Sequence, residues 1–151
     1  MASPSIFRAD ELETVLGRIG RLEPGSPRKW GKMDTAQACA HCQVPIRVAL
    51  GEQKMKRGLI GILFGGLAKK SLMRDEPFKV NLPTDKAFLV RDTRDFRVER
   101  ERLVSLVFRL SRGGPAVLTA EPHPFFGLLT ATEWDTLMWK HLDHHLRQFG
   151  V

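Results

Sequence analysis

The fold is decided by a segment at residues 130–150, which reads TATEWDTLMWKHLDHHLRQFG. Thr130 and Glu133 form a capping-box pattern at its start, in which each side chain accepts a hydrogen bond from the other residue's backbone N–H. Apolar side chains then recur three and four residues apart, as on the buried face of an amphipathic helix. The segment therefore predicts a helix from Ala131 to Phe149, about 28 Å long, which is enough to run the length of a small bundle.

Three further segments are predicted to be helices, from the spacing of their apolar residues or from a capping box at their start. The first covers residues 10–22, and the second covers residues 34–50 and also opens with a capping box. The third begins near residues 92–93 and ends at Gly113. Pro45 lies inside the second helix, where its missing N–H predicts a kink or a local opening. Together these segments predict an all-α fold in which the helices pack as a bundle.

The rest of the chain consists of predicted connections and one shorter helix. Residues 54–74 are basic, apolar and rich in glycine, which lowers helix propensity, so we expect an extra, short and less regular helix there. Residues 77–92 contain residues hostile to long helices and predict a long, extended crossing connection. Residues 23–31 and 115–127 are rich in proline and glycine and predict irregular loops.

Length and composition bound the class of protein. The 151 residues predict a single domain over residues 1–151, and 42% hydrophobic with 27% charged residues is ordinary for a globular protein. Disordered, collagen-like and disulfide-dense chains are therefore excluded. The first residues lack the apolar core of a secretory signal, and the longest apolar stretch, residues 58–68, is too short to cross a bilayer. We expect a cytoplasmic protein without a membrane partner.

The net charge of +7 is concentrated in one segment. Residues 54–74 carry six Lys and Arg residues and no acidic residue. Such a segment could bind nucleic acid or another anionic surface, or form a solvated rim over a pocket. Because Phe64 is the only aromatic residue among these charges, there is no aromatic ladder for single strands, and nucleic acid is an unfavoured partner. We expect the segment at most to attract an anionic substrate or a thiol cofactor.

The candidate chemistry concentrates in the last predicted helix, where three of the five histidines lie within five residues. His141 and His145 share one face of the helix, whereas His144 is rotated about 100° from His145. Two imidazoles four residues apart can bind one divalent metal ion, as in the helical motif of zinc proteases. Leu142 stands where that motif has its glutamate base, so a protease is not supported.

A third metal ligand must come from another helix. His41 lies in an apolar run of the second predicted helix, and a bundle brings inward side chains of separate helices together. Three histidines leave coordination positions open for water or substrate, as in catalytic metal sites. The alternative is that His41, His141 and His145 are hydrogen-bonded histidines at a bundle seam, although burying three imidazoles without a metal is costly.

Further polar side chains are candidates for the same pocket. Cys39 and Cys42 are spaced as CxxC, but they lie within a helix rather than at its start, so we interpret them as small packing residues, with Cys42 able to tune or replace a ligand. His123 is either a hydrogen-bonded loop anchor or a fourth ligand or substrate contact. Residues that could orient the imidazoles or line the pocket are Gln37, His144 and Gln148, for which surface or capping roles are alternatives.

These features resemble a known superfamily. DTAQACAHC at residues 34–42, HPFFGLLTATEW at 123–134 and KHLDHHLRQFG at 140–150 look like the DinB/YfiT-like superfamily of metalloenzymes, in particular its branch of uncharacterised bacterial domains. The resemblance implies an up-down-down-up four-helix bundle and a divalent metal, often nickel or zinc, held by His41, His141 and His145. It also implies thiol-dependent S-transfer or isomerisation with low-molecular-weight thiols. This chain departs from the family in its proline one turn after the first ligand.

The resulting functional prediction is a metal-dependent enzyme of thiol S-transferase or hydrolase type. Its metal would be zinc or nickel, with iron or manganese as alternatives, and it would activate a water or a low-molecular-weight thiol toward a small-molecule substrate. One alternative is a non-catalytic bundle that binds a metal or an anionic ligand. Another is an assembly role with a vestigial site, including a homodimer.

Overall fold

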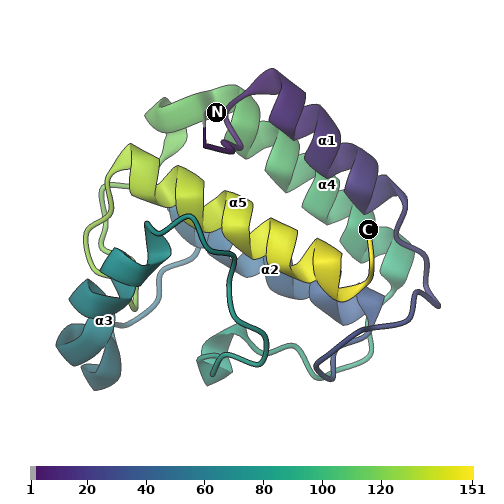
Figure 1. Cartoon of the computed structure of the whole chain (residues 1–151), viewed down its shortest axis with the longest axis horizontal. Helices are drawn as coiled ribbons and strands as arrows, with labels where there is room; N and C mark the ends of the chain where they lie inside the picture. The colour runs from purple at the N-terminus through teal and green to yellow at the C-terminus, as the bar shows by residue number, and fades with distance from the viewer. Residues whose placement is uncertain (1–2) are drawn as a thin grey trace.

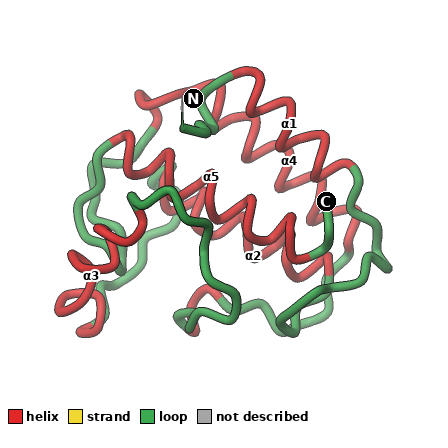
Figure 2. The backbone as a smooth tube through the Cα atoms, in the orientation of Figure 1, coloured by secondary structure: helices red, strands yellow, loops and turns green. Residues whose placement is uncertain are grey.

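The computed structural model describes residues 3–151, and within them the protein has five α-helices, two short 3₁₀ helices and no β-strand (Figures 1 and 2). The predicted all-α class is therefore confirmed. The helices are α1 (Ala9–Gly20), α2 (Thr35–Ala49), α3 (Leu59–Leu72), α4 (Phe96–Gly113) and α5 (Ala131–Gln148), and the 3₁₀ helices are η1 (Lys86–Phe88) and η2 (Gly114–Val117).

Four of the helices share the hydrophobic core. Helix α2 packs against α4 and α5, and α1 packs against the same two helices (Figure 1). The largest fully buried side chains come from all four of these helices and include Ile19, Ile46, Leu110, Trp134 and Met138. Helix α3 contacts α5 but lies to one side of the others (Figure 1). The apolar faces predicted from sequence therefore meet in one core, from which α3 is largely excluded.

Both predicted capping boxes are formed. At the start of α2, the Gln37 N–H donates to the Asp34 carboxylate at 2.8 Å, and the Asp34 N–H donates to the Gln37 side chain at 3.0 Å. At the start of α5, the corresponding distances between Thr130 and Glu133 are 3.2 and 2.8 Å. These caps satisfy N–H groups that have no partner inside the helix, and they set where the two helices that carry the histidines begin.

Two helix starts differ from the sequence expectation. Helix α4 begins at Phe96 rather than near residues 92–93, because the Asp95 carboxylate accepts the Val98 N–H and acts as the cap, while Asp92 forms an ion pair with Arg94. Helix α3 occupies only part of residues 54–74. Helix α2 is one unbroken helix with Pro45 inside it, so the expected local opening does not divide it.

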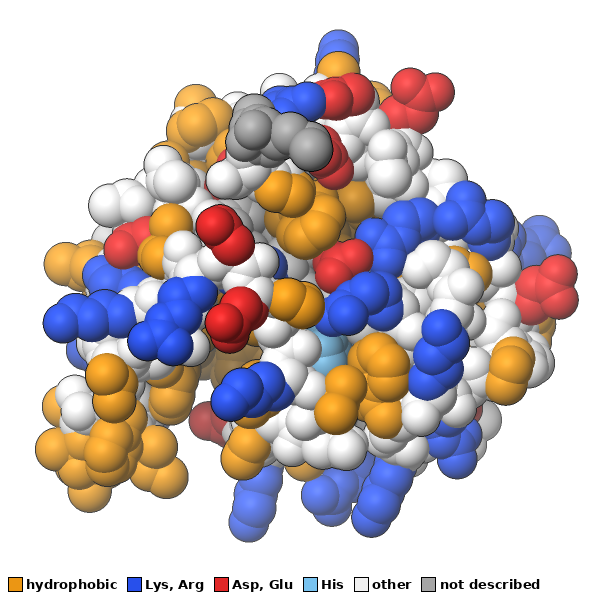
Figure 3. All heavy atoms as spheres, viewed as in Figure 1, with side chains coloured by type: hydrophobic (Ala, Val, Ile, Leu, Met, Phe, Trp, Pro, Cys, Tyr) orange, Lys and Arg blue, Asp and Glu red, His pale blue; other side chains and the backbone are white. Residues whose placement is uncertain are grey.

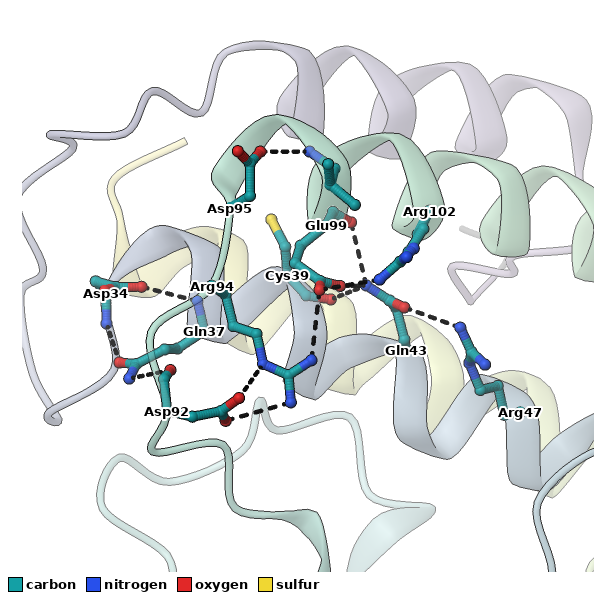
Figure 4. A network of polar contacts seen from close by, with 11 residues as sticks. Asp34, Gln37, Cys39, Gln43, Arg47, Asp92, Arg94, Asp95, Glu99 and Arg102 are labelled. Carbon is teal, nitrogen blue, oxygen red and sulfur yellow. Dashed lines mark hydrogen bonds and ion pairs between the residues drawn. The ribbon is translucent and has the colours of Figure 1, made fainter.

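A buried carboxylate fixes α2 on α4 (Figure 4). Glu99 of α4 is almost fully buried, and its Oε2 accepts a hydrogen bond from Gln43 Nε2 of α2 at 2.7 Å. Arg94 and Arg102 lie 3.4 and 3.2 Å from the Glu99 Oε1 atom. Burying a carboxylate is costly unless it is paired, so this network favours a single register of α2 against α4. It thereby positions His41, which lies two residues before Gln43.

Within residues 3–151, no helix combines the length and the hydropathy that crossing a membrane would require.

Candidate metal centre

Three imidazoles converge between α2 and α5. His41 comes from α2, and His141 and His145 come from successive turns of α5. One ring nitrogen of each lies within 4.8 Å of those of the other two, and the ring centroids are 4.7–4.9 Å apart. In the part of the chain that the structure describes, this is the only such convergence of three or more His, Cys, Asp or Glu side chains. The structure thus brings together the three histidines singled out in the sequence.

Two of the imidazoles are oriented by hydrogen bonds at Nδ1. The His41 Nδ1 lies 2.6 Å from the carbonyl oxygen of Phe88, and the His145 Nδ1 lies 2.8 Å from the Gln148 Oε1. Both partners are acceptors, so each Nδ1 carries the proton and each Nε2 is left with a free lone pair. This is the arrangement in which metal-binding histidines are usually held.

The spacing of the free nitrogens fits a metal ion. The Nε2 atoms of His41 and His141 are 3.0 Å apart. Metal–nitrogen bonds of about 2.0–2.1 Å would place two ligand nitrogens about 2.9 Å apart at a right angle and about 3.3 Å apart at a tetrahedral angle. Without a metal ion, the Nε2 lone pair of His41 can be satisfied only if the His141 Nε2 carries a proton and donates it in a hydrogen bond. With a metal ion bound between them, both Nε2 lone pairs are satisfied. An all-imidazole donor set suits zinc, nickel, copper and iron.

Burial keeps the three histidines neutral. It lowers the pKa of His145 to about 3, with the neighbouring His41 contributing. Burial also lowers the pKa of His41, and together with the other imidazoles it holds the pKa of His141 well below its usual value. A neutral imidazole is the form that binds metal ions, so these side chains need not lose a proton before binding at pH 7.

His144 and His123 lie outside this cluster. His144 contacts the rings of Trp30 and Phe78, with centroids 5.4 and 6.3 Å away, because its place on α5 turns it from the face shared by His141 and His145. The His123 Nδ1 accepts the N–H groups of Phe125 and Phe126 at 3.0 and 3.2 Å. Of the two interpretations of His123, the hydrogen-bonded loop anchor is therefore the one that its contacts match.

Cys39, Cys42 and Gln37 contribute no ligand atom to the cluster. Both cysteines are free and buried among apolar side chains, and burial raises the pKa of Cys39 to about 12 and that of Cys42 well above its usual value. Cys42 therefore does not have the character of a thiolate ligand. The Gln37 side chain closes the α2 capping box and donates to the Asp92 carbonyl at 3.1 Å, so it caps a helix rather than orienting an imidazole.

Two loops supply contacts that the sequence did not indicate. The acceptor for His41 is a backbone carbonyl of η1, 47 residues away in the chain. Gln148, which holds His145, donates through Nε2 to the Trp30 carbonyl at 2.8 Å. Gly31 has a φ of +75°, and a Cβ there would lie 2.6 Å from the Gln148 Nε2, so glycine allows this close approach. Backbone carbonyls carry no sequence signature, so no motif could have found them.

Unpartnered ring nitrogens lie next to the cluster. The Trp30 Nε1 and the His144 Nδ1 are buried and have no hydrogen-bond partner within residues 3–151. The His144 ring is 5.0 Å from the His145 ring and 5.4 Å from the Trp30 ring, so both side chains lie beside the cluster. Buried polar atoms without partners are uncommon and are candidates for contacting a ligand.

A family model described as a protein of unknown function (DUF1569) matches residues 1–150. No match was found among curated proteins or among solved structures.

Proposed function

We propose a function from the site itself, because the chain belongs to the DUF1569 family, whose function is unknown. The proposal is that His41, His141 and His145 hold one divalent metal ion, zinc or nickel foremost, in an enzyme that activates water or a low-molecular-weight thiol. The observation that carries it is the convergence of three neutral imidazoles, two of them already oriented through Nδ1.

The proposal includes a fold assignment, the up-down-down-up four-helix bundle of the DinB/YfiT-like superfamily. The contacts of α1 and α2 with α4 and α5 support it, as do the positions of the three histidines on α2 and α5. Helix α3 would then be an addition to the bundle. In bundles, metal sites are built from inward side chains of facing helices, as these histidines are.

In the proposed enzyme, the metal ion would activate the water or thiol, and the protein side chains would hold the ligands and the substrate in place. A bound divalent ion supplies Lewis acidity, which lowers the pKa of a water or thiol at its open positions. The three histidines contribute no charge, so the ion would keep its full positive charge toward those positions. Phe88 and Gln148 hold two of the rings in place, and the Trp30 N–H, which has no partner among residues 3–151, is free to donate to a substrate.

A thiol used by this site would have to come from outside the protein. Cys39 and Cys42 are buried in the core with raised pKa values, so neither can supply a thiolate. An external thiol is the type of co-substrate that the resemblance implies. The excess of Lys and Arg over acidic residues, a net charge of +7, favours a small, anionic substrate, and Figure 3 shows Lys and Arg side chains spread over one face of the molecule.

Metal analysis of matched variants tests the proposal. After loading with zinc or nickel and dialysis, the wild type should retain about one ion per chain and His141→Ala should retain far less. His144→Ala is the control, because it removes a neighbouring imidazole outside the cluster and should retain the ion. A wild type without stoichiometric metal, or equal loss in both variants, would contradict the proposal.

A second measurement separates the enzyme from a binding protein. The metal-loaded wild type and His141→Ala are compared for reaction of free cysteine with chlorodinitrobenzene and for hydrolysis of a nitrophenyl ester. A metal-dependent rate in the wild type supports the enzyme. Stoichiometric metal without any rate above that of the variant would favour the non-catalytic metal-binding bundle.

A further inference from the structure

Helix α3 presents its bulky side chains to solvent and its glycines to the protein. Gly61 and Gly65 are buried, whereas Leu59, Ile60, Leu63 and the other large apolar residues of its first half are more than half exposed. The complete exposed set is Leu59, Ile60, Ile62, Leu63, Phe64 and Leu67. A helix that packs on its own domain shows the opposite pattern, with large apolar side chains inward. The outward set is called the α3 apolar face below.

The glycines allow α3 to lie close against the loop that follows η2. A Cβ on Gly61 would lie 2.8 Å from the carbonyl oxygen of Pro124, and one on Gly65 would lie 2.2 Å from that of Phe125. Any larger residue at these positions would push the helix away. The helix is therefore seated on the protein through backbone contact at Gly61 and Gly65 and through the buried Leu72 at its end, while its other large side chains face outward.

The C-terminal end of α3 is held against α5 by hydrogen bonds. The Lys140 Nζ donates to the backbone carbonyls of Leu72, Arg74 and Glu76, which lie at and just after the end of α3. Lys69 also donates to the Leu128 carbonyl and lies 3.4 Å from a Glu133 oxygen. These contacts hold the α3 apolar face in a fixed orientation, on a projection at one side of the molecule (Figures 1 and 3).

Basic residues flank the α3 apolar face on both sides along the chain. No acidic residue occurs from position 54 to position 74. Lys54, Lys56, Lys70 and Arg74 are exposed and form no ion pair with any residue in the described range 3–151. In Figure 3 the hydrophobic cluster forms the tip of the projection at the lower left, and Lys or Arg side chains lie directly above it, toward the rest of the molecule. The projection therefore combines an apolar tip with a group of exposed basic residues beside it, Lys54, Lys56, Lys70 and Arg74, which is called the basic collar below.

We propose that the α3 apolar face docks on the surface of an anionic lipid bilayer. The apolar side chains would enter the region between headgroups and acyl chains, and the basic collar would contact the negatively charged headgroups. Such a helix lies on the membrane without crossing it, so the absence of a spanning helix among the described residues is compatible with the proposal. The proposal departs from the expectation, drawn from the sequence, of no membrane partner, because the sequence did not show that α3 is exposed.

Charge complementarity favours a lipid surface over a second copy of the chain. Six large apolar side chains exposed together on one helix mark either a protein or a membrane contact. A symmetric contact through α3 would bring two segments of the same positive charge together, which is unfavourable, whereas an anionic bilayer attracts that charge. This proposal does not depend on the metal centre.

Vesicle binding tests the proposal with the full chain. The purified protein is sedimented with vesicles of phosphatidylcholine alone and with vesicles that contain about 30% phosphatidylserine. We expect binding at least about tenfold stronger to the anionic vesicles, weakening as salt is raised from about 0.1 to about 0.5 M. Phe64→Glu should reduce binding at least about tenfold, because it places a negative charge in the apolar tip.

A matched control comes from another exposed phenylalanine. Phe108 of α4 is 51% exposed, against 55% for Phe64, so Phe108→Glu makes the same change away from α3 and should bind like the wild type. Replacing Lys54, Lys56 and Lys70 with glutamine should weaken binding to anionic vesicles, with circular dichroism confirming the fold. Absence of wild-type binding, or equal binding by Phe64→Glu, overturns the proposal. A wild-type dimer that Phe64→Glu dissociates, without vesicle binding, also overturns it and identifies a second copy as the occupant.

Discussion

Gln148 connects the candidate metal centre to the loop that precedes α2, and its replacement gives a quantitative prediction. It is 2% exposed, accepts from the His145 Nδ1 at 2.8 Å and donates to the Trp30 carbonyl at 2.8 Å. Gln148→Leu has a similar volume but removes both hydrogen bonds. Gln148→Glu keeps an oxygen facing His145 and loses only the N–H that Trp30 requires. The two variants therefore separate orientation of the imidazole from attachment of the loop.

The magnitudes follow from these contacts. Each buried group left without a partner costs about 1–3 kcal/mol, and Gln148→Leu leaves two, so it should lose about 2–6 kcal/mol of unfolding free energy without metal. Loss of a residue that orients a metal-binding histidine typically weakens metal affinity about 10–100-fold, equivalent to about 1.4–2.7 kcal/mol. Gln148→Glu should also lose stability, because its carboxylate faces the Trp30 carbonyl, but it should bind zinc at least as tightly as the wild type.

Two assays measure these quantities separately. Urea unfolding of the metal-free proteins gives stability, and competition with a chromogenic chelator gives zinc affinity. If Gln148→Leu binds zinc as tightly as the wild type, the orienting role of Gln148 is refuted. If Gln148→Glu loses as much affinity as Gln148→Leu, the loss comes from the displaced loop and the reasoning about His145 is wrong.

Two further predictions concern stability alone. Gly65→Ala should destabilise the protein by about 1–3 kcal/mol in urea unfolding, because its Cβ would meet the Phe125 carbonyl, while Gly66→Ala, with nothing within 4 Å, should stabilise it by up to about 1 kcal/mol. If Gly65→Ala and Gly66→Ala changed the unfolding free energy equally, the close packing of α3 against the Phe125 backbone would be contradicted. Burial lowers the pKa of His123 from 6.5 to about 4, so the unfolded chain binds more protons between these values and stability falls as the pH drops through that range. His123→Asn keeps an acceptor for the two loop N–H groups but does not titrate. Between pH 7 and pH 4 the unfolding free energy of this variant should therefore fall by about 3 kcal/mol less than that of the wild type. A variant whose stability depends on pH as the wild type's does would contradict this prediction.

The fold was predictable where local signals and packing agree. The capping residues Asp34 and Thr130 placed the starts of α2 and α5, because a side chain that accepts an N–H three residues on marks a helix start in sequence as in structure. The start of α4 was predicted too early because Asp92, Thr93 and Asp95 can all cap a helix. The structure uses Asp95, whose carboxylate accepts the Val98 N–H, while Asp92 pairs with Arg94 instead.

The grouping of histidines was predictable from helical geometry, but their surroundings were not. The spacing of His141 and His145 places both on one face, and His41 was the remaining histidine in an apolar helix. The Phe88 and Trp30 carbonyls come from loops whose paths are set by long-range packing, so spacing gave no indication of them. The exposure of α3 was equally hidden, since its apolar composition resembles that of a core helix.

The most direct test of the central claim is X-ray absorption spectroscopy of the zinc-loaded protein, which identifies the atoms bound to the metal. The account predicts about three imidazole nitrogens at about 2.0–2.1 Å and no sulfur in the wild type, with one imidazole fewer in His145→Ala and no change in His144→Ala. A sulfur ligand, or an imidazole shell that His145→Ala leaves unchanged, would contradict the assignment of the metal to His41, His141 and His145.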